Sequence, residues 1–285
     1  MSNKIVCQMF SNPIIKKAQE AQLIIMDIVH EFCVKHNIKY YIIGGTALGA
    51  KRHKGFIPWD VDIDIAMLRD DYERFLSLAS SELSPLCECR YFGNTKNHIS
   101  PHALIILKNS RLVFNTDKIN NIHNREVYID IMPLDKAPIS LEKQKKHAQD
   151  LKRISKLKYY KHSAIYNSNT KIVAILKRIT RGILSIISWK YINTLQHRTM
   201  VRHRNEESNF VCSMASQYSY TKQCMDISIY GEPQLVEFEN RMYYAPQQIE
   251  KYLTRIYGDY MKLPSTEKQQ EQASLIVDVS VPNQL

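Results

Sequence analysis

The sequence predicts a core that mixes helices and strands, of the α+β or α/β class, in a chain of 285 residues. Between Ile14 and His36 apolar residues recur three or four positions apart, which is typical of an amphipathic helix. Short apolar runs such as 38–43 and 102–108 have the length and composition of buried strands, and they alternate with the helical patterns. A chain of this length can bury a substantial core.

Local signals place the ends of each element. Asn12-Pro13 suits the start of a helix, Gly44 and Gly45 end the first strand, and Asp70-Asp71 can cap a further helix. The predicted elements are a helix over 14–36, a strand over 38–43, a helix over 46–53, a strand over 61–67, a helix over 70–83, strands over 102–108 and 126–132, and helices over 171–192 and 246–257.

Charge divides the chain into three predicted parts, a core over 1–139, a basic helical insertion over 140–204 and a C-terminal part over 205–285 that packs on the core. The insertion holds sixteen Lys and Arg and two acidic residues, a balance of +14 against +11 for the whole chain. Such an excess indicates a polyanionic partner, which could be nucleic acid, an anionic membrane surface or a phosphorylated substrate.

The basic insertion also carries an apolar stripe at helical spacing. Its members are Ile172, Ile175, Leu176, Ile179, Ile183, Ile186 and Ile187, while Lys171, Arg178 and Arg181 fall largely elsewhere. Two interpretations stay open, packing of the stripe against the core and an interfacial helix lying on anionic lipid. Nucleic-acid binding is the weaker interpretation because no nucleic-acid module is recognised.

Cysteine usage and the chain start indicate a reducing compartment. The six cysteines (Cys7, Cys33, Cys87, Cys89, Cys212 and Cys224) lack the spacing of metal ligands, so free buried thiols are expected. Residues 1–13 lack the apolar core of a signal peptide, and no run approaches the roughly 18 apolar residues of a membrane span. We therefore expect a soluble cytoplasmic protein, with a peripheral position at the inner face of the membrane if the basic insertion binds lipid.

The stretch "GGTALGAKRHKGFIPWDVDIDIAM", residues 44–67, concentrates the chemistry. In a strand, residues two apart share a face, so Asp62 and Asp64 point the same way and Asp60 stands at the entrance. Like charges at such positions repel unless a cation lies between them, and a hard divalent ion such as Mg²⁺ prefers carboxylate oxygen. The alternative is a solvated strand face.

Asp130 is the one acid inside the apolar run "VYIDIM". If that strand pairs beside 61–67, Asp130 completes a three-carboxylate cluster that could hold two cations for an in-line phosphoryl displacement. The alternative is an ion pair between Asp130 and a nearby Lys or Arg.

Gly44, Gly45 and Thr46 stand between a strand and a helix, where backbone N–H groups and the helix N-terminus favour a phosphate. Arg52 and Lys54 add fixed cations suited to a pyrophosphate, and His53 lies between them, either as a donor to phosphate or as an ordinary surface residue.

These residues together resemble the nucleotidyltransferase superfamily and, within it, the LicD family of phosphorylcholine transferases. The segments "EFCVKHNIKYYI", "YIDIMPLD" and "YLTRIYGDYMKLP" extend the resemblance over about residues 14–135 and 230–268. The resemblance implies an α+β fold in which a nucleotidyltransferase-like mixed sheet is flanked by helices, followed by a mostly helical basic segment and a helical C-terminal part.

The resemblance also implies roles. Asp62, Asp64 and Asp130 would bind Mg²⁺ or Mn²⁺, as two ions, and act catalytically; Gly44, Gly45, Thr46, Arg52, His53, Lys54 and Lys108 would contact the donor. Val61 replaces an acid that the family often has, and "IILK" replaces an Ala-Lys-hydrophobe-Arg strand, so Lys108 is the one candidate there.

The leading hypothesis is transfer of a phospho-alcohol, most simply phosphocholine from CDP-choline, onto a hydroxyl of a glycan or lipid-linked glycan of the cell surface, with release of CMP. One alternative is a nucleotidyltransferase that attaches NMP to a small molecule or sugar. Another is a non-enzymatic protein that binds membrane or nucleic acid.

Overall fold

The computed structural model describes residues 12–96, 98–115, 125–163, 175, 179, 182–274 and 276–282. The chain forms two compact units. Unit 1 comprises Met1–Cys89, Ala103–Leu134 and Asp226–Leu285, and unit 2 comprises Arg90–His102 and Asp135–Met225.

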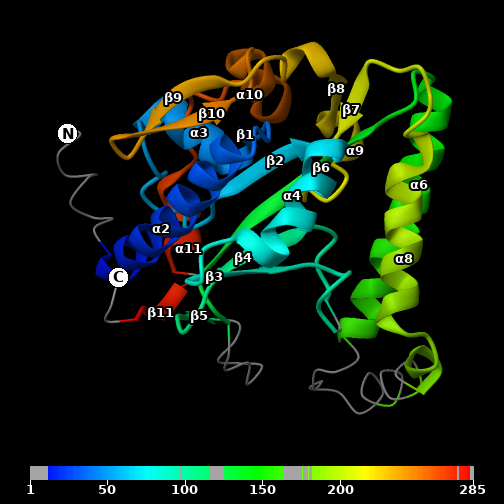
Figure 1. Cartoon of the computed structure of the whole chain (residues 1–285), viewed down its shortest axis with the longest axis horizontal. Helices are drawn as coiled ribbons and strands as arrows, with labels where there is room; N and C mark the ends of the chain where they lie inside the picture. Colours follow the sequence, from blue (N-terminus) through cyan, green and yellow to red (C-terminus); the bar gives the residue numbers. More distant parts are fainter. Residues whose placement is uncertain are drawn as a thin grey trace. The chain divides into compact units, whose positions relative to one another are not determined.

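A mixed sheet forms the centre of unit 1, with strands in the order β1-β2-β6-β4-β3 (Figure 1). These strands are β1 (Tyr41–Ile42), β2 (Asp64–Leu68), β6 (Tyr128–Lys136), β4 (Ala103–Leu107) and β3 (Cys87–Arg90). Strands β2 and β6 run parallel, whereas β1 and β4 pair antiparallel with β2 and β6, respectively. A mixed sheet of this kind confirms the predicted α+β class.

Helices flank this sheet because each buries one apolar stripe. Helix α2 (Pro13–Lys35) packs on β4, and helix α4 (Arg69–Glu82) packs on β2. The side chain of Asn12 caps α2 by accepting a 3.0 Å hydrogen bond from the N–H of Ile14. Helix α3 (Gly44–His53) connects β1 to the loop before β2.

The C-terminal part of unit 1 is helical only in part. Helix α10 (Ile249–Tyr257), close to the predicted span, packs against α3, and helix α11 (Thr266–Ala273) follows. Three strands were not predicted here: β9 (Gln234–Phe238) and β10 (Arg241–Ala245) form a hairpin, and β11 (Ile276–Ser280) pairs with β5 (Arg111–Phe114).

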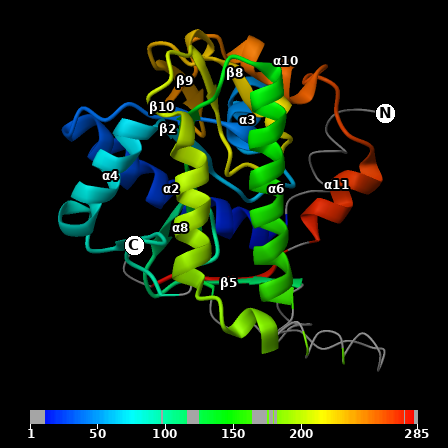
Figure 2. The ribbon, with the colours of Figure 1, turned by 90° about the vertical axis from the view of Figure 1, so that its right-hand side faces the viewer.

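Unit 2 is built on two long helices, α6 (Leu141–Ser163) and α8 (Trp189–Met200), which lie side by side in both ribbon views (Figures 1 and 2). The 3₁₀ turn η1 (Val201–His203) ends the pair. Strand β7 (Phe210–Cys212) joins the last two residues of β6 to β8 (Cys224–Asp226), and the short helix α9 (Tyr220–Gln223) precedes β8. Among the described residues no helix is long and apolar enough to cross a bilayer.

Several predicted boundaries were wrong for local reasons. The strand predicted over 38–43 is limited to Tyr41 and Ile42, which are the two residues that pair with β2, at Ala66 and Ile65. The strand predicted from Val61 begins at Asp64 instead.

The helix predicted over 171–192 was also wrong as one element. It is interrupted before α8, because the Ser188 side chain accepts a hydrogen bond from Tyr191 N and starts a new helix. In the apolar stripe and its neighbours, Ile172, Leu176, Lys171, Arg178 and Arg181 lie outside the described residues, as does Cys7. The other five cysteines are buried free thiols, as predicted.

Candidate active site

The centre of the candidate site is the start of the parallel strand pair β2–β6. Asp64 and Asp130 are register partners there, and the N–H of Asp130 donates to the carbonyl of Ile63 at 3.0 Å. Partners in neighbouring strands lie about 4.8 Å apart and project from the same face. The structure therefore brings Asp130 beside Asp64 across sixty-five intervening residues, as the sequence hypothesis required.

Asp60 and Asp62 lie in the loop that leads into β2 rather than in the strand itself. The carboxylate of Asp60 accepts a 2.9 Å hydrogen bond from the N–H of Val61, which turns the chain toward the strand. The carbonyl of Asp60 is held by the side chain of Gln19 on α2, at 2.7 Å. The aspartate-rich loop is thus anchored to the helix that covers the sheet.

The four carboxylates act on one another electrostatically. Burial raises the pKa of Asp64 well above its ordinary value, and the charges of Asp130, Asp62 and Asp60 raise it further. Asp62 exposes surface to solvent, yet enough protein surrounds it that desolvation, helped by Asp60 and Asp130, raises its pKa to about 7. Such mutual repulsion is expected of several carboxylates that together bind one cation.

The two glycines at the start of α3 lie against these carboxylates. A Cβ on Gly44 would stand 2.9 Å from Asp64 Oδ2, and one on Gly45 would stand 2.8 Å from Asp60 Oδ2. Gly44 also has a φ of +54°, which strains any other residue. Glycine is therefore needed here for close approach of the helix start to the aspartates, and the positive end of the helix dipole favours their charge.

Thr46 holds α3 to β2. Its side chain is 3 % exposed, and its hydroxyl accepts a 2.8 Å hydrogen bond from the N–H of Asp64. The same hydroxyl lies 3.5 Å from the carbonyl of Asp62, to which it donates. Thr46, a predicted donor contact, thus also has a structural role that the sequence analysis did not foresee.

Tyr252 and Tyr128 were missed by the sequence analysis. The N–H of Gly44 donates to the hydroxyl of Tyr252 at 2.9 Å, so α10 fixes the first turn of α3. Tyr128 precedes Asp130 by two positions on β6, and its carbonyl accepts from the buried Gln22 of α2. The sequence signal for this contact was Gln22 itself, a polar residue within the apolar stripe of 14–36.

The basic triplet lies at the other end of α3. Arg52 donates from Nη1 to the carbonyl of Tyr260 at 3.0 Å and from Nε to Nε2 of His53 at 2.9 Å. Burial and the Arg52 charge lower the pKa of His53, which favours its neutral, accepting form. Lys54 has a left-handed backbone and an exposed side chain.

The structure places Lys108 away from the carboxylates. Leu104 is the register partner of Asp130, and Lys108 follows four residues later, just beyond the end of β4. At about 3.3 Å per residue this separates Lys108 from Asp130 by roughly 13 Å along the strand. Its predicted contact with the donor stays a prediction.

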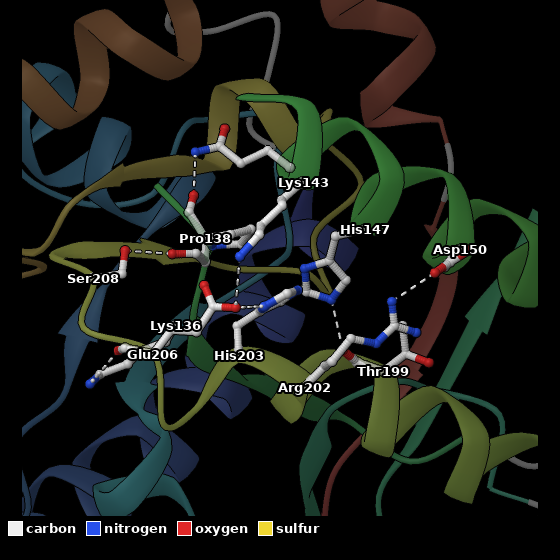
Figure 3. Close-up of polar contacts among 12 residues, drawn as sticks. Lys136, Pro138, Lys143, His147, Asp150, Thr199, Arg202, His203, Glu206 and Ser208 are labelled. Atoms are coloured by element: carbon white, nitrogen blue, oxygen red, sulfur yellow. Dashed lines mark hydrogen bonds and ion pairs between the residues drawn. The ribbon is translucent and has the colours of Figure 1, made fainter. Parts of the chain in front are cut away.

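A second polar cluster lies in unit 2 (Figure 3). His147 on α6 contacts the carbonyl of Thr199 through Nε2 at 2.7 Å and the hydroxyl of Tyr220 through Nδ1 at 3.0 Å. Nδ1 of His203 bonds Glu206 at 2.9 Å, and the two imidazole rings lie 4.7 Å apart. Because each group bonds within the cluster, it holds α6, η1 and α9 together.

The donor set of the first site fits a hard divalent cation. It consists of carboxylates alone, which are the ligands that Mg²⁺ prefers. Among the described residues no three His, Cys, Asp or Glu side chains are already arranged to hold a metal ion. Asp64 and Asp130 are nevertheless register partners on neighbouring strands.

Comparison with known proteins identifies relatives. The family described as "LicD/FKTN/FKRP, nucleotidyltransferase domain" matches residues 37–161, which include all four aspartates. "Lipopolysaccharide cholinephosphotransferase LicD" of Haemophilus influenzae is 29% identical over 267 residues, which cover 88% of this chain and 94% of that protein.

Two shorter similarities accompany it. "Uncharacterized protein RT0683" of Rickettsia typhi is 47% identical over 60 residues, 21% of this chain and 19% of that protein. Human "Ribitol 5-phosphate transferase FKRP" is 34% identical over 55 residues, 19% of this chain and 11% of that protein.

Proposed function

We propose that this chain moves phosphocholine from CDP-choline onto a hydroxyl of a lipopolysaccharide glycan and releases CMP, because the LicD family matches residues 37–161 and a LicD cholinephosphotransferase is similar over 88% of the chain. The similarity to a cholinephosphotransferase extends over nearly the full length of both proteins, which supports the same reaction class and substrate. The observation that carries the proposal is the register pairing of Asp64 with Asp130 beside the start of α3.

Asp62, Asp64 and Asp130 are the proposed metal ligands, for Mg²⁺ or Mn²⁺ and for two ions. A bound divalent ion supplies Lewis-acid activation and neutralises the phosphate charge during an in-line displacement. The aspartates bind and orient it, and their mutual repulsion is relieved when they do so. The N-terminus of α3 holds Asp60 and Asp64 in place for this task.

In the proposed reaction the acceptor oxygen forms a bond to the phosphorus of phosphocholine. The bond from that phosphorus to the bridging oxygen breaks, and the bridging oxygen leaves on CMP. Asp130 accepts the proton of the acceptor hydroxyl, since its carboxylate stands at the strand start where the other aspartates gather. The site would lower the activation free energy mainly by stabilising the negative charge that develops on the leaving group.

The proposed donor contacts are Gly44, Gly45, Thr46, Arg52, His53, Lys54 and Lys108. Their available groups differ. The N–H of Gly44 is already paired with Tyr252, so Gly45 and Thr46 are the better sources of backbone N–H groups. Lys54 has an exposed side chain, whereas Arg52 is partly engaged by the carbonyl of Tyr260.

The proposal is tested by incubating the purified chain with CDP-choline, CDP-ethanolamine, CDP-glycerol or CDP-ribitol, lipopolysaccharide and Mg²⁺, and measuring CMP and acceptor labelling. We expect CMP and choline-labelled acceptor with CDP-choline. Labelling from CDP-ribitol alone would move the substrate toward that of the ribitol 5-phosphate transferase. Pyrophosphate release from a nucleoside triphosphate, without CMP from any donor, would instead support nucleotidyl transfer.

A further inference from the structure

An exposed apolar surface is present in unit 2 near the end of α6. Its residues, here called the apolar tip, are Tyr159, Tyr160, Ile175, Ile179, Ile183 and Ile186. Their exposed fractions run from 53% for Tyr160 to 87% for Ile186. Large apolar side chains on one surface of a protein mark an interaction site when they are this exposed.

The isoleucines recur at helical spacing in the sequence. Ile175, Ile179 and Ile183 are four residues apart and Ile186 follows three later; the backbone is helical at 175, 179 and 182–185, and Ile186 lies in the bend that follows. In the described part of the stripe these side chains do not pack into a core, so the interpretation that the stripe packs against the catalytic core gains no support there.

Lys161 attaches the segment that carries Ile183 and Ile186 to the end of α6. Its Nζ donates to the carbonyl of Leu184 at 2.6 Å and lies 5.5 Å from the centre of the Trp189 ring. These contacts fix the isoleucine segment next to the last turns of α6, which carry Tyr159 and Tyr160. The aromatic and aliphatic side chains therefore belong to one end of unit 2.

Exposed lysines flank the apolar tip in the sequence. From Leu151 to Asn205 the sequence has thirteen Lys and Arg and no Asp or Glu. Exposed Lys152 and Lys156 lie on α6 before the tyrosines, and exposed Lys190 follows the isoleucines. A partner that complements both the apolar and the cationic side chains is the headgroup boundary of a lipid bilayer. There Ile and Tyr enter the acyl region and lysines meet phosphate.

We propose that the apolar tip docks unit 2 on the surface of an anionic lipid bilayer. Nucleic acid would satisfy the cations but leave the isoleucines in water. A second copy of the chain would bring its own exposed lysines against these, which is unfavourable. A lipid surface complements both features.

The test is co-sedimentation of the full chain with vesicles of phosphatidylcholine, alone or mixed with phosphatidylglycerol, at low and moderate salt. We expect binding to the mixed vesicles that weakens with salt. The double variant Ile183→Asp/Ile186→Asp should bind at least about tenfold less, because two apolar contacts become anionic. Leu235→Asp/Met242→Asp is the matched control, since these hairpin residues are similarly exposed and the charge change is the same.

Three results would overturn the proposal: equal binding by the tip variant and wild type, equal loss in the control variant, or no preference for anionic vesicles. Sedimentation velocity without vesicles adds a fourth, because an oligomer that the tip variant dissociates would make the tip a protein interface. Vesicle binding does not require turnover, so docking and the proposed transferase activity can fail independently.

Discussion

Replacing Thr46 with Val is the substitution that best separates a structural role from a substrate contact. The change keeps the shape of the side chain and removes the hydroxyl that accepts from the N–H of Asp64 at 2.8 Å. Because Thr46 is 3 % exposed, no bulk water replaces the lost acceptor. The start of β2 then carries an unsatisfied N–H next to the aspartates of the proposed active site.

The expected cost is that of leaving one buried backbone donor unpaired, about 1–3 kcal/mol in the free energy of unfolding. Thr46→Ser is the matched control. It keeps the hydroxyl and loses one methyl, which costs about 0.8 kcal/mol. Thr46→Val should therefore unfold more easily than Thr46→Ser, and turnover should fall with it because Asp64 is displaced.

Urea unfolding of both variants without any donor measures these costs. A Val variant as stable as wild type, with only its KM for the donor raised, would refute the structural role of Thr46 and favour a direct phosphate contact. A Ser variant less stable than the Val variant would contradict the hydrogen-bond argument itself.

Three further predictions concern other parts of the chain. Gly45→Ala should lower turnover about tenfold or more, since its Cβ would stand 2.8 Å from Asp60 Oδ2, whereas Gly182→Ala, with no atom within 4 Å, should leave turnover unchanged in steady-state assays. Burial lowers the pKa of His147, so the unfolded chain binds more protons and stability falls as pH drops below about 6.5; His147→Gln should flatten that fall in thermal melts, and an unchanged slope would exclude the effect. Burial raises the thiol pKa of Cys87 to about 11, so maleimide at neutral pH should label none of the five buried cysteines before unfolding, and mass spectrometry of the native protein would reveal any exception.

Sequence patterns predicted the parts of the site whose signal is local. The alternation of apolar and acidic residues around Asp64 and the single acid Asp130 predicted a site on two paired strands. A carboxylate in an apolar run is costly to bury unless it is paired or binds a cation. The amphipathic period of 14–36 predicted α2, because an apolar helix face must be buried.

The contacts that could not be predicted are those between distant segments. Tyr252 reaches Gly44 across 208 positions, and Gln19 reaches the carbonyl of Asp60 across 41. No period or motif encodes such pairs, because they depend on how helices pack on the sheet. The structure also adds a second reason for the glycines: they let neighbouring carboxylates approach closely, which a search for phosphate-binding loops does not consider.

Short strands were missed for two reasons, a distant partner strand for β11 and a weak turn signal for the β9–β10 hairpin. β11 is recognisable only once β5 is in place beside it, and the β9–β10 hairpin turns at Glu239 and Asn240, which both have positive φ without glycine. Asn favours this conformation and Glu does not, so the usual turn signal was weak.

The central claim is that the aspartates at the start of β2 and β6 carry out phosphocholine transfer. Its most direct test is the rate of CMP release from CDP-choline, with Mg²⁺ and lipopolysaccharide, by the double variant Asp64→Asn/Asp130→Asn. Asp278→Asn, an exposed position on β11, is the control. The account predicts a loss of at least about a thousandfold in the double variant, with melting temperature retained and the control unchanged. Turnover near the wild-type rate in a folded double variant would contradict it.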